Sequence, residues 1–486
     1  MSHKSDKSAE QGEIFSGLFW KFGERIIAQG VSFVVSLVLA RLLMPDEYGI
    51  VALVLVFINL ANVFVSDGLG SALVQRLNAT SKDFSTMFYC SGILSIFLYL
   101  LLFFIAPAIA RFYQNPALAP VLRVLSLQVP LSAVKTIQHA YVQRHMIFKK
   151  FFWSTLGGTL VSGVVGIAMA YAGCGVWSLV AQYLVNSVID TIILFITVEW
   201  HPAFEFDIHA AKEMTQYGWR LMAAQFINTF YTELQSLLIG KVYSEADLAA
   251  YNKGNQFPSL LITNINVSIS SVLFPAMARS AYDPVALKAL TKKSIKMSSY
   301  ILFPMLAGLI AVANPLISLL LTDNWLCCVP FLQIGCIYWM FQPSQTANVQ
   351  AIKASGRSDI CLKLEVIKKV IGITLLLLSI RINVYAVVIS NALFAGISAL
   401  LNIIPNKKLI GYGIMDQLAD CAPALLLSGA VFVAASFVLR FNLINIVTLA
   451  LQVVIGVAVY VGGSILFKVE SFYYILNMIK NHTKKL

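Results

Sequence analysis

Polar side chains at helical spacing mark the first apolar segment of this sequence as one that could do chemistry. Arg25, Gln29, Ser32 and Ser36 follow one another at intervals of four, three and four residues, which places them on one side of a helix. If the segment crosses a membrane, a charge inside it costs about 2.5–3.5 kcal/mol on insertion scales, so this side should face a cavity or another helix. The alternative is that Arg25, near the end of the segment, extends to the membrane interface.

A later apolar segment, residues 217–240, has a similar row of polar side chains and also contains a carboxylate. Arg220 stands near its start, and Asn228 and Glu233 follow among further hydroxyl and amide residues. Arg220 again has the interfacial alternative, and Glu233 the alternative of a hydrogen bond between helices. We expect both segments to line a cavity for a polar substrate, with Glu233 also a weaker candidate for binding a coupling ion.

Prolines interrupt two further apolar segments at corresponding positions, beside Gln128 and Gln342. Proline removes a backbone hydrogen bond from a helix, and interrupted helices in the two halves of a transporter point to a substrate site. The alternative is a kinked helix held by amide bonds to its neighbours. The candidate binding residues around the two prolines are Gln128, Lys135, Gln342, Gln345 and Asn348.

Two carboxylates, Asp190 and Glu365, lie inside or at the start of other apolar segments. A carboxylate in a membrane span could carry H⁺ or Na⁺ for coupled transport. Glu365 is followed closely by Lys368 and Lys369, so pairing with a cation is an equally good explanation. Asp190 stays a weak candidate for ion coupling.

The sequence contains none of the motifs that would indicate an enzyme. The six histidines are dispersed without metal-ligand spacing, and the seven cysteines are scattered as small packing residues. Neither a phosphate-binding G-x-x-x-x-G-K-[ST] loop nor a G-x-S-x-G or H-E-x-x-H motif occurs. We therefore expect no catalytic residues, no metal and no cofactor.

The composition indicates a membrane protein. Of the 486 residues, 58% are hydrophobic and only 12% are charged, against roughly 45–50% and 25% in soluble proteins. The formal charge of +12 does not indicate nucleic-acid binding, because the Lys and Arg residues lie between apolar segments instead of clustering in a soluble domain. The mean hydropathy of +0.78 agrees with a single polytopic unit that contacts membrane lipids.

Fourteen segments have the length of about 20 residues that a helix needs to cross a bilayer. This predicts an all-α polytopic membrane protein. The segment 256–275 is the most polar of them. The predicted spans are 22–43, 47–66, 84–106, 117–138, 151–172, 176–198, 217–240, 256–275, 297–321, 328–351, 363–380, 384–404, 418–439 and 443–467.

The distribution of positive charge predicts the orientation of the chain. With the span-end residues Lys363 and Arg41 counted in the adjacent loops, the N-terminal tail, the even-numbered loops and the C-terminal tail carry 23 of the 35 Lys and Arg residues, whereas the opposite side carries six. Because cytoplasmic loops retain positive charge, both termini are expected in the cytoplasm. No predicted loop exceeds about twenty residues, which leaves no room for a soluble catalytic domain.

Similar segments recur at offsets of 200 to 210 residues and predict an internal duplication. The expected parts are an N-terminal tail (1–21), a first six-span lobe (22–198), a cytoplasmic linker (199–216), a second lobe (217–404), two added spans (405–467) and a C-terminal tail (468–486). An even number of spans gives both lobes the same orientation, related by an axis along the membrane normal. The paired segments are 41–47 with 241–247, Pro107 with Pro315, 120–125 with 330–335, and 175–180 with 383–388.

Several motifs resemble those of bacterial polysaccharide exporters of the Wzx type, which belong to the multidrug/oligosaccharidyl-lipid/polysaccharide (MOP) superfamily. The run Leu39-Ala-Arg-Leu-Leu-Met-Pro-Asp-Glu-Tyr-Gly-Ile-Val-Ala-Leu53 and the later Ser66-Asp-Gly-Leu-Gly-Ser-Ala-Leu-Val-Gln-Arg76 carry the resemblance. Tyr251-Asn-Lys-Gly-Asn-Gln-Phe-Pro258, Val272-Leu-Phe-Pro-Ala-Met-Ala-Arg279 and Ala351-Ile-Lys-Ala-Ser-Gly-Arg357 look most like the branch that contains the colanic acid exporter.

The resemblance implies a flippase that moves undecaprenyl-pyrophosphate-linked oligosaccharide repeat units across the bacterial inner membrane by alternating access, around a central cavity. Its implied partners are the lipid-linked substrate, membrane lipids, a polysaccharide polymerase and a chain-length regulator, with H⁺ or Na⁺ as the coupling ion. The product would be O-antigen, capsule or exopolysaccharide. A cationic cavity suits a pyrophosphate, and Arg25, Lys135 and Arg220 are the candidate cations.

Three alternatives remain open from the sequence. An ion-coupled drug extruder of the same superfamily would usually have twelve spans and a buried acidic pair. A flippase for a peptidoglycan precursor would share the span number and a basic cavity. A membrane enzyme such as a repeat-unit polymerase would need a larger outer loop than any predicted here.

Overall fold

The computed structural model describes residues 27–66, 70, 73, 80–145, 147, 149–280 and 282–483. Its elements in these ranges are all helices, with no strand among the described residues. They are an unlabelled helix Ile27–Leu42, α2 (Pro45–Ser66), α4 (Ser81–Tyr113), α5 (Leu118–Leu125), α6 (Gln128–Arg144), α7 (Lys149–Tyr171), α8 (Val176–Thr197), α9 (Ile208–Val242), α10 (Glu245–Arg279), α11 (Pro284–Leu320), η1 (Asp323–Cys328), α12 (Val329–Met340), α13 (Gln342–Ala354), α14 (Ser358–Ser379), α15 (Val384–Ile410), α16 (Ile414–Phe437), η2 (Val438–Phe441), α17 (Asn445–Leu466) and α18 (Glu470–Thr483).

These helices confirm the predicted fold class of an all-α polytopic membrane protein. In the described part of the chain, ten helices are long and apolar enough to cross a bilayer, and Ile27–Leu42 is a shorter apolar helix. Three more helices, α9, α10 and α14, have 35, 35 and 22 residues, which is long enough to span although their sequences are more polar. The described helices are therefore consistent with fourteen spans, and the exact number stays a prediction.

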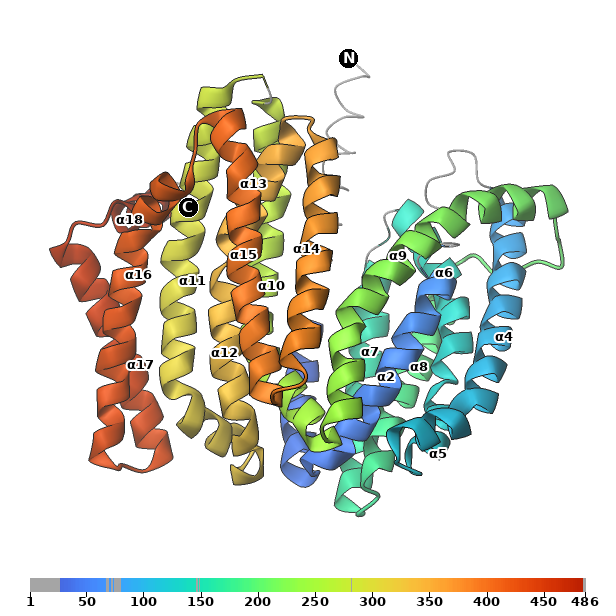
Figure 1. Cartoon of the computed structure of the whole chain (residues 1–486). Coiled ribbons are helices and arrows are strands. Elements are labelled where there is room, and N and C mark those ends of the chain that lie inside the picture. The colour runs from blue at the N-terminus through green and yellow to red at the C-terminus, as the bar shows by residue number, and fades with distance from the viewer. Residues whose placement is uncertain are drawn as a thin grey trace. The chain divides into compact units, whose positions relative to one another are not determined.

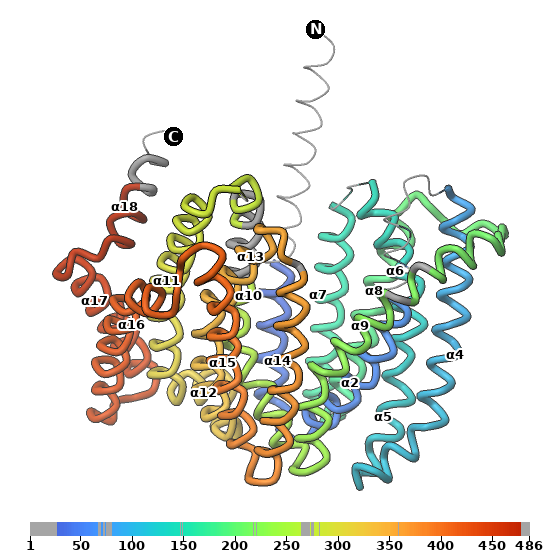
Figure 2. The backbone as a smooth tube through the Cα atoms, turned by 45° about the horizontal axis from the view of Figure 1, so that its top comes forward, coloured from blue at the N-terminus to red at the C-terminus, as the bar shows by residue number. Residues whose placement is uncertain are grey.

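The chain forms two compact units, residues 1–249 and 250–486 (Figure 1). In the first unit α9 packs against α2 and α4, and α7 packs along α8. In the second unit α16 and α17 form a hairpin that lies against α11 (Figures 1 and 2). The helix α9 thus belongs by its packing to the first unit, whereas the repeat places residues 217–240 at the start of the second lobe; the lobe boundaries stay a prediction.

The structure confirms the two predicted helix interruptions. The fourth span is divided between α5, which ends at Leu125, and α6, which begins at Gln128. The tenth span is divided in the same way between α12 and α13, with a single residue, Phe341, at the junction. Pro130 and Pro343 lie in the first turn of the second helix in each case, where the missing proline N–H leaves no hydrogen bond unmade.

The first repeated motif has the same local structure in both copies. Glu47 accepts a hydrogen bond from the backbone N–H of Met44, the residue before α2, at 2.8 Å. Asp247 accepts one from the backbone N–H of Ser244, the residue before α10, at 3.3 Å. The recurrent acid therefore caps a helix start, where the carboxylate is favoured by the unpaired N–H groups.

Two other repeated motifs also fall at equivalent points of their helices. Gly175 is the N-cap of α8, and Asn383 is the N-cap of α15. Pro107 and Pro315 both lie in the last two turns of long helices, α4 and α11. The duplication read from the sequence is therefore visible in the local backbone structure.

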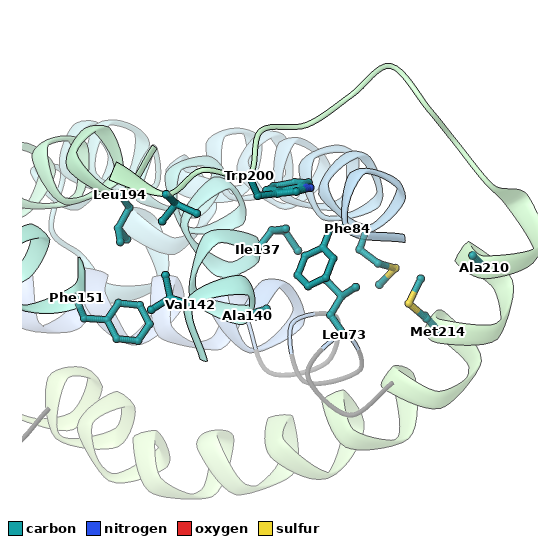
Figure 3. Packing of buried hydrophobic residues seen from close by; sticks show 12 residues of the cluster. Leu73, Phe84, Ile137, Ala140, Val142, Phe151, Leu194, Trp200, Ala210 and Met214 are labelled. Carbon is teal, nitrogen blue, oxygen red and sulfur yellow. The ribbon is translucent and has the colours of Figure 1, made fainter. Parts of the chain in front are cut away.

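The predicted linker between the lobes is bound to the first turns of α4. The indole Nε1 of Trp200 donates to Ser81 Oγ at 3.1 Å, and the backbone N–H of Asp207 donates to Thr86 Oγ1 at 3.0 Å. Trp200 also belongs to a buried cluster with Phe84 and Ile137, which Figure 3 shows. Two segments predicted to lie on the same side of the membrane are thus in direct contact.

The other end of α4 contacts segments predicted to lie on the opposite side. Asn115 Nδ2, just beyond α4, donates to Glu245 Oε1 at 3.0 Å, and the Lys241 ammonium donates to the carbonyl of Phe112. Both contacts join the ends of spans that the predicted topology places together. The alternation of the chain across the membrane therefore agrees with the packing at both ends of α4.

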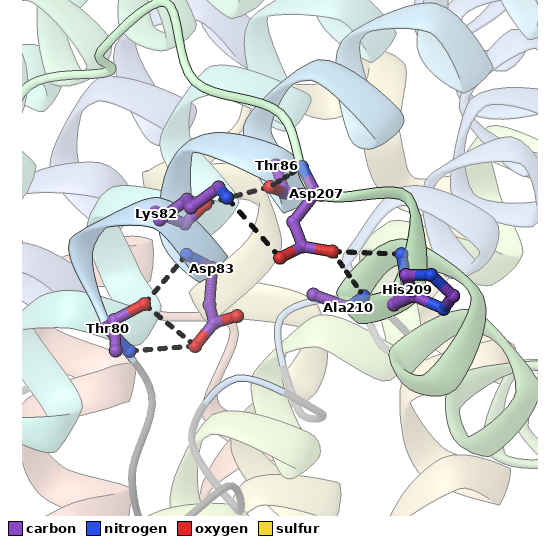
Figure 4. Close-up of polar contacts among 7 residues, drawn as sticks. All are labelled: Thr80, Lys82, Asp83, Thr86, Asp207, His209 and Ala210. Atoms are coloured by element: carbon purple, nitrogen blue, oxygen red, sulfur yellow. Dashed lines mark hydrogen bonds and ion pairs between the residues drawn. The ribbon is translucent and has the colours of Figure 1, made fainter.

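We expect the Asp207 carboxylate to stabilise this attachment in a pH-dependent way. Asp207 caps α9 and pairs with Lys82 at 3.4 Å (Figure 4). Its pKa is lowered below the ordinary value, first by the hydrogen bond from the Ala210 amide and further by the amide of His209 and by Lys82. A lowered pKa means that the stabilisation is present above the ordinary pKa and is lost as the pH falls through the folded-state value.

Asp207→Ala should therefore lower the Tm of the purified protein at pH 7, and the difference from wild type should shrink below about pH 4, as measured by thermal unfolding in detergent. Glu205→Ala removes an exposed carboxylate from the same segment and should leave the Tm unchanged. A Tm difference for Asp207→Ala that does not change with pH would contradict the electrostatic part of this explanation.

Candidate functional site

An ion pair lies within the spans of the first unit. Lys135 on α6 places its Nζ 3.0 Å from Oδ2 of Asp190 on α8. The lysine side chain is 27% exposed and the aspartate side chain 10% exposed, so the lysine is the partner that a ligand can reach. The sequence singled out both residues without pairing them, and the structure brings them together.

Close packing of α7 on α8 fixes the position of Asp190. A Cβ atom added at Gly158 of α7 would stand 3.1 Å from the backbone oxygen of Asn186 and 3.3 Å from the Cβ of Asp190. Only glycine lets the two backbones approach this closely without displacing one of them. His139, one turn beyond Lys135 on α6, is near enough to interact electrostatically with both charges, and its ring lies 4.5 Å from that of Phe151.

The aspartate keeps one oxygen without a hydrogen bond. Its Oδ1 atom is buried and has no hydrogen-bond partner among the described residues. An unsatisfied buried acceptor costs about 1–3 kcal/mol, and more when it is charged. The site therefore combines a partly exposed lysine side chain with a carboxylate oxygen that has unused capacity to bind a proton or a cation.

The polar face predicted on α9 is only partly within the described structure. Glu233 accepts a hydrogen bond from Asn59 Nδ2 of α2 at 3.1 Å, and Asn228 is exposed on α9. The side chain of Arg220 lies outside what the structure describes, and Arg25 lies outside the described residues. Gln29, on Ile27–Leu42, is half-buried.

In the second unit the predicted residue Asn348 is the centre of a buried amide cluster. Its Nδ2 donates to Gln417 Oε1 at 2.9 Å, and its Oδ1 accepts from Gln417 Nε2 at 2.9 Å and from Asn406 Nδ2 at 2.7 Å. Asn348 and Asn406 have no exposed surface. These bonds join α13, α15 and α16. They agree with the alternative given above for this segment, a kinked helix held by amide bonds to its neighbours.

The remaining predicted amides differ in their surroundings. Gln345 Nε2 donates to the carbonyl of Ala395 on α15 at 3.2 Å. Gln342 Nε2 bonds only weakly within its own helix, to Thr346 Oγ1 at 3.5 Å. Gln128 is half-buried at the start of α6. Gln345 therefore holds two helices together, whereas Gln128 and Gln342 stand at the helix interruptions.

Glu365 on α14 pairs with Lys368 one turn later, which is the pairing explanation that the sequence left open. In the part of the chain that the structure describes, no group of three His, Cys, Asp or Glu side chains could hold a metal ion.

Sequence reasoning missed three residues that complete these contacts, namely Asn59, Asn406 and Gln417. Each is an amide within or at the edge of an apolar helix, and a buried amide must find a hydrogen-bond partner. That signal could have marked the residues but not their partners.

Comparison with known proteins identifies a family model that matches residues 38–330 and is described as "Polysaccharide biosynthesis protein". The chain is 26% identical over 304 residues to the teichuronic acid biosynthesis protein TuaB of Bacillus subtilis (strain 168), a match that covers 62% of each protein. It is 27% identical over 297 residues to the succinoglycan biosynthesis transport protein ExoT of Rhizobium meliloti (strain 1021), covering 61% of this chain and 60% of ExoT.

The lipopolysaccharide biosynthesis protein WzxC of Escherichia coli (strain K12) is 26% identical over 360 residues, covering 73% of this chain and 72% of WzxC. The matches to TuaB and ExoT thus span about six tenths of the length of those relatives.

Two solved structures have a similar fold. The lipid II flippase MurJ in its inward closed conformation superposes with a TM-score of 0.73 and 15% identity, covering 91% of this chain and 98% of MurJ. A multidrug resistance transporter of the MATE family, in the MOP superfamily, superposes in its inward-facing conformation with a TM-score of 0.61 and 14% identity, covering 79% of this chain and 94% of the transporter. At these identities the likeness is one of fold.

Breaking the Lys135–Asp190 pair should destabilise the protein. Asp190→Ala leaves the Lys135 ammonium without its counter-ion in a membrane span and should lower the free energy of unfolding by about 1–3 kcal/mol. Adding Lys135→Met should restore part of the loss, because the double variant has no unpaired charge. Unfolding of both variants in detergent measures the difference.

The control for that comparison is Glu199→Ala, which breaks the exposed contact between Glu199 and Lys150 (3.5 Å) and should change stability by at most about 1 kcal/mol. If the double variant is less stable than Asp190→Ala, the ion pair does not hold α6 on α8.

Asn348→Ala should also destabilise the protein by about 1–3 kcal/mol, because Gln417 and Asn406 lose their amide partner in a buried site. Gln350→Ala changes a partly exposed amide of the same helix and is the matched control. A variant that loses transport but keeps wild-type stability would assign Asn348 to substrate binding instead of helix packing.

Proposed function

Because this chain belongs to the polysaccharide biosynthesis protein family, we propose that it moves a lipid-linked oligosaccharide repeat unit from the inner to the outer leaflet of the bacterial cytoplasmic membrane. The repeat unit is then assembled into a surface polysaccharide. The observation that carries the proposal is the partly exposed Lys135 side chain, which lies in a helix able to span the membrane and is held by Asp190. Both termini lie in the cytoplasm.

The pyrophosphate is the part of such a substrate that crosses a membrane least readily. Its negative charges lose their hydration in a low-dielectric environment, which is costly unless charged donors replace the water. A hydrogen bond from an ammonium to a phosphate oxygen is short and about twice as strong as a neutral one. Lys135 supplies that donor, and Arg25 and Arg220 are the further cations assigned to the pyrophosphate.

The Asp190 carboxylate gives Lys135 a second, exchangeable partner. Without substrate, Asp190 holds the ammonium in place. When a phosphate binds the Lys135 ammonium, Asp190 loses its counter-ion and binds a proton or Na⁺ instead. The buried Oδ1 atom of Asp190, which has no hydrogen-bond partner among the described residues, is available for this. Substrate and coupling ion would then bind at the same time, each replacing one partner of the ion pair, with Glu233 as the weaker second candidate for the ion.

The sugar part of the substrate is bound by amides. An amide group both donates and accepts hydrogen bonds, as a sugar hydroxyl requires. This role is assigned to Gln29, Gln128, Asn228 and Gln342, whereas Gln345 and Asn348 hold α13 against its neighbours α15 and α16. No bond is made or broken, so the protein acts as a transporter, with a polymerase and a chain-length regulator as partners that use the translocated unit.

The names of the curated relatives favour a glycan over the alternative substrates. TuaB, ExoT and WzxC are each named for the synthesis or transport of a polysaccharide. The similarity to a lipid II flippase and to a multidrug transporter is one of fold, which does not fix the substrate.

The test is a deletion strain complemented with variants. Deletion should abolish the surface glycan, while complete lipid-linked repeat units accumulate on the cytoplasmic leaflet, where an impermeant probe of the outer surface cannot reach them. Lys135→Ala should restore less than about a tenth of the wild-type glycan. Lys135→Arg should restore more than Lys135→Ala does, because arginine keeps the positive charge. Asp190→Asn should flatten the dependence of transport on pH or on Na⁺.

Lys353→Ala, which removes an exposed cation at the end of α13, is the control and should complement fully. Protein amounts in the membrane are measured for each variant. If surface glycan and its precursors are unchanged in the deletion strain and drug efflux falls, the chain is a drug extruder; if peptidoglycan precursors accumulate, it is a precursor flippase.

A further inference from the structure

A cavity of about 740 Å³ lies within the second unit, among α11, α16 and the turn that joins α17 to α18. It shares no residue with the group around Lys135. Its inner wall is formed by small and aliphatic residues of α16, including Ala422, Leu426 and Ala430. Leu426 is 74% exposed and Phe467, at the turn, is 70% exposed, so the apolar wall opens to the outside of the helix bundle, where lipid chains lie.

The polar groups deep in the cavity are already satisfied. The Tyr300 hydroxyl, which borders the cavity, is hydrogen-bonded to Ser464 Oγ at 2.6 Å, and the Tyr460 hydroxyl donates to the carbonyl of Tyr300 at 2.6 Å. The base of the cavity therefore offers a ligand only apolar contact.

The mouth of the cavity carries charges of both signs. Lys296 Nζ lies 2.6 Å from Glu470 Oε2 and 3.7 Å from Asp420 Oδ1, and Lys468 is exposed beside them. The pKa of Glu470 is lowered by its hydrogen bond with Lys296, so the carboxylate is ionised at neutral pH. Asp420 is also paired with Lys292 at 3.1 Å and accepts a hydrogen bond from the Tyr412 hydroxyl at 2.9 Å, so both of its oxygens have partners. Glu470 is therefore the carboxylate at the opening that a ligand can reach.

Lys468 is held in an unusual backbone conformation. Its φ of +48° is left-handed, a region in which glycine or asparagine is the usual residue. A lysine there ends α17 with its charge at the cavity mouth, at the cost of local backbone strain. Strained residues of this kind are concentrated at ligand sites.

The last helix, α18, begins at the mouth of the cavity. On α18, Phe472 and Ile475 pack inward against the cluster of Tyr300 and Phe303, whereas Tyr473 and Tyr474 are exposed. Aromatic residues with a polar tip are enriched at the boundary between lipid tails and headgroups. This places the charged mouth at headgroup level and the apolar wall at the level of the chains.

We propose that this cavity binds a phospholipid whose headgroup carries both a phosphate and a primary ammonium, as in phosphatidylethanolamine. The phosphate lies against Lys296 and Lys468, the ammonium donates a hydrogen bond to Glu470, and one acyl chain lies along the α16 wall. An anionic headgroup would meet the Glu470 carboxylate without a cation to offer it. A choline headgroup, with no N–H, would leave Glu470 without a donor.

The experiment measures lipid binding by the purified full-length protein. Lipids with identical acyl chains and ethanolamine, choline or glycerol headgroups are added to delipidated protein in detergent, and bound lipid is counted by native mass spectrometry. We expect the ethanolamine lipid to bind about fivefold more tightly than the other two, the gain that partly exposed charge pairs give. Binding is measured without any glycan, so the result is independent of the proposed transport.

Variants separate the two halves of the headgroup. Glu470→Gln should remove the preference for ethanolamine over choline, and Lys468→Ala should weaken both lipids equally. Ala422→Phe fills the apolar part and should abolish binding, while Lys408→Ala, an exposed lysine at the end of α15, should change nothing. Equal binding of ethanolamine and choline lipids by the wild type, or an unchanged preference in Glu470→Gln, would overturn the proposal.

Discussion

The bilayer removes the water that would otherwise solvate polar groups, and every polar side chain in a span of this protein has to be placed under that constraint. The described structure meets it by pairing. Lys135 is paired with Asp190, Glu233 with Asn59, and Asn348 with Gln417. Each pair joins two different helices, so the same contacts that satisfy the polar groups also decide which helices are neighbours.

The pairs differ in what remains available after pairing. The Asn348 amide is buried and fully hydrogen-bonded, so it has nothing left to offer a ligand. The ion pair of Lys135 leaves a partly exposed lysine side chain and an unsatisfied carboxylate oxygen. A group that is incompletely satisfied inside a membrane is less stable than it could be, and a ligand that completes its hydrogen bonds gains that difference as binding energy.

Much of the fold could be predicted from the sequence, because the length of an apolar segment and the position of a proline determine the structure of that segment itself. The helix interruptions before Pro130 and Pro343 follow from the missing N–H of proline, and the repeated acids Glu47 and Asp247 follow from helix capping. Side-chain partners could not be predicted in this way. Helical spacing shows which side of a helix is polar, but the pairing of Lys135 with Asp190 depends on how α6 packs against α8. The position of α8 depends in turn on the close approach of α7, which the glycine at position 158 allows.

The attachment of the predicted linker to α4 has a consequence for how the protein is made. A chain leaves the ribosome from its N-terminus, so residues 199–207 emerge directly after α8 and find their partners, Ser81 and Thr86, already synthesised. The attachment needs nothing from α10 or any later helix. The first helices can therefore be locked into their arrangement in the membrane while the second unit is still being translated, which shortens the time during which their polar side chains are without partners.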